Sequence, residues 1–472
     1  MSELCIEKRE ILFEKYSSKI EIDPKLDRTL VSFQANKKEY FYRWFKYKEG
    51  FSKRLVKYFL LKYHPSPGHI LDPFAGVGSA LFAARELGWE STGIELLPVG
   101  VFAIESRIAS ESVSLDKLKE EIDKFKSNFQ VGENNISNRI SHISITKGAF
   151  PDESENHLNC FLNYCDNIKD SSIKKLFEFS AFSVLEDISY TRKDGQYLRW
   201  DYRANKSWGK IKFDKGKIYP FIESITNKLL DVYQDLKFGN GHDLFSEIEE
   251  KQFDLKTPNI LQGSSLELMP EFENDVFDFI MTSPPYCNRY DYTRTYALEL
   301  IFLGYNDVQV KKLRQEMLSC TVENKEKFEI LNNIYKKLNK IEVFDKVISL
   351  YNANEAMQEV NNALTLLNER DLLNNSNIPR MVKNYFLEMA FIIFEMHRML
   401  KNGGYAVMVN DNVRYGGQEI PVDLILSDFA VNFGFNLEKI WTLPTGKGNS
   451  SQQMGDHGRF ELRKCIYVWR KK

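Results

Sequence analysis

The sequence has few cysteines, and they are too dispersed to build a zinc site or a disulfide framework. Six cysteines are spread over 472 residues, and no two of them form a CxxC pair. Cys160 and Cys165 lie near His157, but no second ligand pair accompanies them, whereas a structural zinc ion needs four ligands. We therefore predict no metal site, and free thiols in a reducing compartment.

The sequence also lacks a long apolar run and a strong net charge. It begins with the charged residues MSELCIEKREILFEKY, where a secretory signal needs an apolar core, and no stretch approaches the roughly 18 apolar residues of a membrane span. These absences predict a soluble, cytoplasmic protein without membrane contact. The formal net charge is −2, so a nucleic-acid partner must meet a local basic patch rather than a global positive field.

An alternation of helix, strand and glycine turn predicts a parallel sheet. Ser52 is typical of a helix N-cap, and apolar residues follow it at helical spacing. A short strand over 69–72 enters the turn DPFAGVG, and a helix over about 79–88 leads to a strand over 89–95. Strands joined through a helix run parallel in one sheet. The predicted fold class is therefore α/β, a doubly wound and mostly parallel sheet that carries two large inserts.

Two stretches interrupt this alternation. The first, over about 110–255, is polar with mixed helical and irregular character, and the second, over about 311–378, has helical spacing. Outside them we expect Gly403-Gly404 to break the chain between a helix and a strand. The remaining expected strands are 259–263, 277–283, 405–410, 436–443 and 462–469, and the helices are 382–400 and 421–433. The predicted segments are 1–109 (N-terminal segment and first half of the core), 110–258 (insert), 259–310 (second half of the core), 311–378 (helical insert) and 379–472 (C-terminal part of the sheet).

The turn over 72–78 lies where a strand hands over to a helix. Ligands of doubly wound sheets bind outside the carboxyl ends of the strands, and glycine lets the backbone approach them. Leu81 occupies the third glycine position of a GxGxxG pattern, which disfavours a dinucleotide site. Glu95 ends the next strand, where a carboxylate is placed to accept hydrogen bonds from ribose hydroxyls. These features predict a nucleoside site; a tight packing turn and a solvated strand end are the plainer alternatives.

A second turn, Thr282-Ser283-Pro284-Pro285-Tyr286, follows an apolar strand. Neither proline has an N–H, so the strand ends and a rigid loop begins. An exocyclic amine that is conjugated with its ring is a poor nucleophile until acceptors hold its N–H groups. The Ser283 hydroxyl and the Pro284 carbonyl are suitable acceptors, and Tyr286 is suited to stack on a base. A strand terminator with a core tyrosine is the plainer alternative for this turn alone.

Together, DPFAGVGS and TSPPY resemble the motifs of the DNA amino-methyltransferase family, whose members make N4-methylcytosine and N6-methyladenine with S-adenosylmethionine. The resemblance covers about 40–107, 259–302 and 380–470, and it implies a Rossmann-like class I methyltransferase fold. It implies that Ser283, Pro284, Pro285 and Tyr286 form the catalytic loop. The implied cofactor-binding residues are Phe51, Ser52, Asp72, Pro73, Phe74, Gly76, Gly78, Glu95, Leu96, Ser264 and Ser265.

The same resemblance implies a role for each part of the cofactor site. The turn over 72–78 surrounds the methionine moiety, Glu95 binds the ribose, and Phe51-Ser52 matches a segment that lines the methionine side. Ser264-Ser265 stands where the family usually has an aspartate near the adenine, so this contact departs from the pattern. The glycine turn precedes TSPPY, which excludes the circularly permuted branch of the family.

Ser283, the first residue of Ser-Pro-Pro-Tyr, indicates which base is the substrate. In the family, Asp-Pro-Pro-Tyr goes mostly with adenine and Ser-Pro-Pro-Tyr mostly with cytosine, so Ser283 favours cytosine N4 and leaves adenine N6 as the alternative. The base must be flipped out of the duplex to reach such a loop. Transfer to a held amine needs neither a metal nor the neighbouring Cys287 as a nucleophile. An RNA-base methyltransferase of the guanine-N2 type and a non-catalytic nucleic-acid-binding protein are the remaining alternatives.

A basic and aromatic segment in the first insert is the main candidate for contact with double-stranded DNA. Residues 189–217 contain nine Lys/Arg and three Asp/Glu, with aromatic residues between them. A pair of basic strands on a solvated face is the plainer alternative. The loop over 446–459 is a second candidate, and a restriction endonuclease is the further partner that a restriction–modification setting implies. The candidate DNA-binding residues are Arg192, Lys193, Arg199, Trp200, Arg203, Arg289, Lys447 and Arg459.

Overall fold

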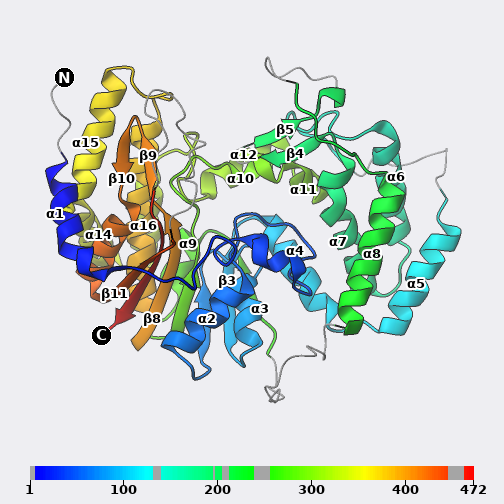
Figure 1. The fold of residues 1–472 in the computed structure, drawn as a ribbon, viewed down its shortest axis with the longest axis horizontal. Helices are drawn as coiled ribbons and strands as arrows, with labels where there is room; N and C mark the ends of the chain where they lie inside the picture. Colours follow the sequence, from blue (N-terminus) through cyan, green and yellow to red (C-terminus); the bar gives the residue numbers. More distant parts are fainter. Residues whose placement is uncertain (1–5, 131–139, 195–196, 205–211, 239–255, 445–461) are drawn as a thin grey trace.

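The computed structural model describes residues 6–130, 140–194, 197–204, 212–238, 256–444 and 462–472. Its centre is an eight-stranded sheet in the order β1-β11-β12-β8-β7-β2-β3-β6 (Figure 1). Neighbouring strands are parallel except around β12, which is antiparallel to both β11 and β8. The predicted fold class is confirmed. The strands of this sheet are β1 (Ile20–Ile22), β2 (His69–Asp72), β3 (Glu90–Glu95), β6 (Asn259–Gln262), β7 (Phe277–Thr282), β8 (Leu400–Asp411), β11 (Phe435–Thr442) and β12 (Lys464–Lys471).

Helices cover both faces of the sheet, because successive residues of each strand point to opposite sides. Ile70 and Phe279, which are register partners, pack in one cluster with α2 and α3. Leu71 and Ile280, the next pair, belong to a cluster with α16 and α17. The helices that flank the sheet are α1 (Glu7–Tyr16), α2 (Lys53–Tyr63), α3 (Ser79–Arg85), α4 (Pro98–Ser110), α9 (Ser265–Leu268), α16 (Ile378–Met399) and α17 (Val422–Phe433). The short helices α10 (Tyr292–Thr295) and α11 (Ala297–Phe302) lie beside the first insert, where α10 contacts β5 (Tyr197–Trp200) and α11 contacts α7 (Ser171–Ile188).

The strand at the C-terminal side of the core differs from the prediction. Gly403-Gly404 does not break the chain, since β8 runs without interruption through both glycines. A side chain at position 404 would place its Cβ 2.8 Å from the carbonyl oxygen of Asp278 on β7. Glycine here permits a close approach of two strands, and the register between them shifts at this point. The edge strand β1, which pairs in parallel with β11, has no counterpart among the predicted elements.

The two interrupting stretches are largely helical. The first forms a group of helices at one side of the sheet, on the right of Figure 1, together with a small hairpin of β4 and β5. The second packs against α16, α17 and α1 on the other side. Among the described residues, none of the helices combines the length and the apolar character of a membrane span. The elements are α5 (Leu115–Asn128), α6 (Asp152–Cys165), α7 (Ser171–Ile188), β4 (Thr191–Asp194), β5 (Tyr197–Trp200) and α8 (Phe221–Phe238), then α12 (Asp307–Glu316), α13 (Phe328–Lys337), α14 (Ile341–Ala353) and α15 (Glu355–Glu369).

Candidate active site

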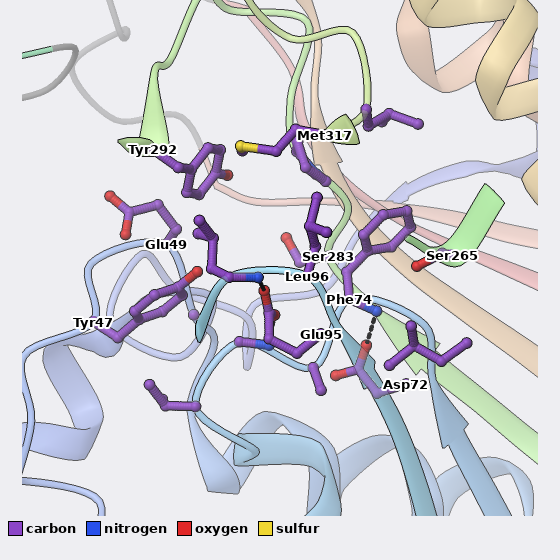
Figure 2. A pocket seen from close by; sticks show the side chains of 18 of the residues that line it. Tyr47, Glu49, Asp72, Phe74, Glu95, Leu96, Ser265, Ser283, Tyr292 and Met317 are labelled. Carbon is purple, nitrogen blue, oxygen red and sulfur yellow. Dashed lines mark hydrogen bonds between the residues drawn. The ribbon is translucent and has the colours of Figure 1, made fainter. Parts of the chain in front are cut away.

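A cleft opens at the carboxyl ends of β2, β3, β6 and β7, which is the edge where ligands of doubly wound sheets bind (Figure 2). It contains about 740 Å³ of space, part of which is open solvent. Residues of the glycine turn, of the strand end at Glu95 and of the TSPPY turn line the same cleft. The structure thus brings together two turns that lie about 200 residues apart in the sequence.

The glycine turn needs glycine at two positions. Gly76 and Gly78 have φ angles of 55° and 78°, in the left-handed region that side chains disfavour. A Cβ at Gly76 would also lie 3.0 Å from the ring of Tyr47, which forms the neighbouring wall. Gly78 is the N-cap of α3 and does not itself line the cleft. The turn therefore presents backbone to the cleft at Gly76 and directs the chain into the helix at Gly78.

Glu95 holds the glycine turn in place. One carboxylate oxygen accepts a hydrogen bond from the Gly76 N–H at 2.6 Å, and the other accepts one from the Leu97 N–H at 2.7 Å. Burial raises the pKa of Glu95 to about 7, although these two N–H donors act in the opposite direction. A carboxylate has about four lone-pair positions, so Glu95 retains acceptor capacity toward the cleft. Leu96 lines the cleft beside it.

Asp72 connects the two turns. Its Oδ1 accepts a hydrogen bond from the Phe74 N–H at 3.0 Å and one from the Thr282 hydroxyl at 2.7 Å. Burial is the main cause that raises the pKa of Asp72 to about 7. Asp72 and Phe74 line the cleft, and the carbonyl of Pro73 accepts a hydrogen bond from the Ser265 hydroxyl. The end of β2 is thus tied to the ends of β6 and β7.

The TSPPY turn presents only part of itself to the cleft. Ser283 and Pro285 line it, whereas Pro284, which is buried, and Tyr286 do not. The Ser283 hydroxyl lies 3.1 Å from the hydroxyl of Tyr286 and donates to it. Burial raises the pKa of Tyr286, so this phenol is neutral. Cys287 is buried as well, and burial raises the pKa of its thiol well above the usual range, which disfavours the thiolate that a nucleophile needs.

Of the remaining predicted cofactor residues, three line the cleft and one does not. Phe51, Ser264 and Ser265 line the cleft. The Ser264 hydroxyl donates to the carbonyl of Glu316 at 3.3 Å. Ser52 does not line the cleft: its hydroxyl accepts from the Leu55 N–H at 3.2 Å and donates to the Leu30 carbonyl at 2.8 Å. Ser52 therefore acts as the N-cap of α2, as its sequence position predicted, and supports the cleft from behind.

Two groups of residues that line the cleft have no counterpart among the residues predicted from the sequence. Tyr47 and Glu49 come from the aromatic run before Phe51, and Tyr292 comes from α10. The second group, Glu316, Met317 and Leu318, lies at the end of α12 and directly after it, in the helical insert. The density of tyrosines in 40–47 was the one available signal for the first group. Nothing in the local sequence marked the second.

The basic segment in the first insert contributes fewer free charges than its composition suggested. Lys193 is buried on the inner face of the hairpin, where its ammonium pairs with Glu299 and lies 4.6 Å from the ring centre of Tyr296. A role for Lys193 in contacting DNA does not fit this position. Its neighbour Arg192 is exposed, because adjacent strand residues face opposite sides. Register pairs Arg192 with Arg199.

The other candidate DNA-binding residues lie in different surroundings. Arg199 pairs with Asp194 at 3.1 Å, and Arg203 pairs with Asp201 at 2.6 Å, while Trp200 is half-buried at the end of β5. Arg289 follows the TSPPY turn, has a φ of 66° and donates to Asn374 at 2.9 Å. Lys447 and Arg459, with the loop that holds them, lie outside the described residues.

Comparison with known proteins identifies the family. The chain is 47% identical over 468 residues to the type II methyltransferase M.AvaI of Nostoc sp., an alignment that covers 98% of this chain and 92% of that protein. It is 42% identical over 475 residues to the type II methyltransferase M.BsoBI of Geobacillus stearothermophilus, with 97% and 91% covered. No protein-family model and no solved structure matches the chain. On the strength of these full-length relatives, the chain belongs to the type II DNA methyltransferases, the site-specific enzymes of restriction–modification systems.

Proposed function

We propose that this DNA methyltransferase transfers a methyl group from S-adenosylmethionine to the exocyclic amine of a flipped base, namely N4 of cytosine. One observation carries the proposal: Ser283 and Pro285 line the same cleft as Gly76 and Glu95. An acceptor for an amine and a site for a nucleoside thus share one space. Direct transfer requires that proximity, since positioning provides most of its acceleration.

The residues that line the cleft suit S-adenosylmethionine in their donors and acceptors. Glu95 is placed to accept hydrogen bonds from the ribose hydroxyls while it keeps the Gly76 turn closed. Leu96 and the pair Ser264-Ser265 then flank the adenine, and Phe51 and the turn over 72–78 surround the methionine moiety. When bound there, S-adenosylmethionine supplies an electrophilic methyl group on a sulfonium.

The TSPPY turn prepares the amine. The Ser283 hydroxyl and the carbonyl of Pro284 accept the two N–H groups of the base, which turns the nitrogen lone pair toward the methyl group. The ring of Tyr286 stacks on the base and holds its plane. The amine loses one proton after the transfer, and no covalent bond to the protein forms. The buried, protonated Cys287 supports this route over one with a cysteine nucleophile.

DNA meets the enzyme beside the hairpin of β4 and β5. Arg192 and Arg199 lie on exposed or half-exposed positions of this hairpin and are suited to phosphate contacts. The target base leaves the duplex to reach the TSPPY turn, at a cost of a few kcal/mol that contacts in the pocket offset. In a restriction–modification system, the resulting mark protects the host from an endonuclease with the same recognition sequence.

The test is to express the protein and analyse the host DNA by modification-sensitive sequencing and by mass spectrometry of its nucleosides. N4-methylcytosine at one short sequence is the expected result. If the DNA contains N6-methyladenine instead, the substrate is adenine, the alternative. If the DNA is unmodified although the protein is expressed, the proposal is refuted. Ser283→Ala expressed in parallel is the matched control for background methylation.

A further inference from the structure

One wall of the cleft combines a carboxylate with aromatic rings, and neither the ribose site at Glu95 nor the TSPPY turn includes it. Tyr47, Glu49 and Tyr292 line the cleft on one side, while Phe74 and Ser265 lie on the opposite side (Figure 2). We call these three residues, Tyr47, Glu49 and Tyr292, the tyrosine–glutamate wall. Tyr47 also stacks on Tyr296 behind it, with ring centres 5.0 Å apart and an interplanar angle of 15°.

Glu49 is the only charged member of this wall, and hydroxyl groups surround it. It accepts a hydrogen bond from the Tyr296 hydroxyl. Among the described residues, no lysine, arginine or histidine forms an ion pair with it. The ammonium of Lys193 is nearby, but it pairs with Glu299, which is itself buried. The positive charge of Lys193 is therefore paired mainly with Glu299.

This arrangement is incomplete without a cation. Burial raises the pKa of Glu49, and the tyrosine hydroxyls and the nearby charge of Lys193 only partly offset that effect. A carboxylate that has lost its hydration and has no cation in contact is poorly stabilised. A ligand cation in contact with it offsets the lost hydration. Aromatic faces attract cations as well, and two rings that line the cleft flank Glu49. The wall is thus suited to an ammonium group rather than to an anion or an apolar group.

Asp72 is another carboxylate that lines the cleft, and it is a weaker candidate for the ammonium. Its Oδ1 already accepts two hydrogen bonds, and it is 1% exposed beneath the turn. Glu49, by contrast, is half-buried, and its hydrogen bond comes from a tyrosine behind the wall. Glu49 is therefore the more accessible of the two to a cation that enters from the cleft.

We propose that Glu49 binds the α-ammonium group of the methionine moiety of the cofactor, with Tyr47 and Tyr292 as the flanking rings. The proposal rests on the proposed function, because it assumes that S-adenosylmethionine occupies the cleft. It assigns the tyrosine–glutamate wall to the amino-acid end of the ligand and leaves the nucleoside end to Glu95.

Two ligands separate this role from a structural one. S-adenosylhomocysteine keeps the ammonium and lacks the sulfonium, whereas 5′-methylthioadenosine keeps the nucleoside and lacks the amino-acid group altogether. Titration calorimetry of the full chain measures the dissociation constants of these two ligands and of S-adenosylmethionine for the wild type and for Glu49→Gln. We expect Glu49→Gln to weaken the binding of S-adenosylhomocysteine by at least about tenfold and to leave that of 5′-methylthioadenosine within about twofold, because only the former ligand loses a hydrogen bond between charged groups.

Controls keep the result interpretable. Glu329→Gln neutralises an exposed carboxylate on α13 and should change none of these constants. Glu49→Asp retains the charge on a shorter side chain and should recover part of the affinity, and thermal melting checks that each variant is folded.

Several outcomes would overturn the assignment. Unchanged binding of S-adenosylhomocysteine by Glu49→Gln removes the role, and a parallel loss for both ligands makes Glu49 structural. A loss confined to S-adenosylmethionine points to the sulfonium instead. If Glu49→Gln and the wild type have the same ratio of affinities for S-adenosylhomocysteine and 5′-methylthioadenosine, and Asp72→Asn binds S-adenosylhomocysteine more weakly, then Asp72 binds the ammonium. A wild type that binds none of the three ligands contradicts the proposed function itself.

Discussion

The Thr282 hydroxyl donates a hydrogen bond of 2.7 Å to Asp72 Oδ1 and so joins the last residues of β7 and β2. These two strands are neighbours in the sheet, and their ends carry the TSPPY turn and the glycine turn. The contact fixes the distance between the proposed amine-binding loop and the proposed cofactor turn. Substitutions in one turn should therefore be separable from those in the other by whether methyl transfer or cofactor binding changes.

The first prediction separates the hydroxyl of Tyr286 from its ring. Ser283→Ala removes an acceptor for the amine and should lower single-turnover methyl transfer by about 10²–10³-fold. Tyr286→Ala should lower it to a similar extent, whereas Tyr286→Phe, which keeps the stacking ring, should retain most activity. All three should bind S-adenosylmethionine like the wild type. Transfer at wild-type rates by both alanine variants would refute the assignment.

The second prediction concerns Glu95. In Glu95→Gln, one end of the amide must face the N–H of Gly76 or Leu97 with its own donors, so the turn loses a hydrogen bond. We expect the affinity for S-adenosylmethionine to fall by about tenfold or more in calorimetry. Glu90→Gln, at the opposite and exposed end of β3, is the matched control and should bind normally. Equal affinities of the two variants would remove Glu95 from the site.

The third prediction follows from the raised pKa of Asp72, about 7 in the folded, ligand-free protein. Unfolding returns this carboxyl to an ordinary pKa, so between about pH 4 and 7 the folded state holds a proton that the unfolded state has lost. The free energy of unfolding should therefore fall as the pH rises through this window. Asp72→Asn should flatten the fall, as measured by urea titrations from pH 5 to 8. Parallel curves for both proteins would contradict the assignment of the shift.

The fourth prediction concerns DNA binding. Arg192→Glu with Arg199→Glu should weaken binding to duplex DNA and lower the slope of log K against log salt by about 0.9 for each phosphate that the protein no longer neutralises. Lys126→Glu on α5 changes an exposed lysine of the same insert and serves as the comparison. If the double variant and the control have the same salt slope, the hairpin is not the DNA-binding surface.

The fifth prediction tests the buried pair of Lys193 and Glu299, whose side chains are 3% and 1% exposed. Lys193→Met leaves Glu299 buried without a cation and should destabilise the protein by about 3–5 kcal/mol. Lys193→Met with Glu299→Leu should recover most of that stability, because no charge remains buried. Denaturant unfolding of both variants measures the difference. A double variant less stable than the single one would show that the pair is net stabilising.

Local patterns in the sequence predicted the core well, because its signals are local. The apolar strand over 277–282, the prolines that end it and the glycines at 76 and 78 all act within a few residues. The sequence did not predict which other segments line the cleft. Met317 arrives from an insert, and Glu49 from a loop before the first core helix, through contacts between segments that are remote in the sequence. No short-range pattern carries that information.

Two other differences have specific physical causes. The composition of 189–217 suggested a uniformly basic surface, but a strand alternates its faces, so Arg192 and Lys193 point in opposite directions. The glycines at 403 and 404 are typical of a break, yet here they allow β8 to approach β7 closely. In both cases the prediction from residue type was wrong, because the neighbour that decides the role of the residue lies elsewhere in the chain.

The edge strand β1 has a consequence for how the chain assembles. Its Ile20 pairs with Ile440, so nearly the whole protein must leave the ribosome before this edge finds its partner. Pairing over such a separation is slow, because a very long loop must close first. Until β1 pairs with it, β11 has an unpaired backbone edge, the kind of surface that promotes association between chains. The short strand β1 therefore protects that edge only in a late step of folding.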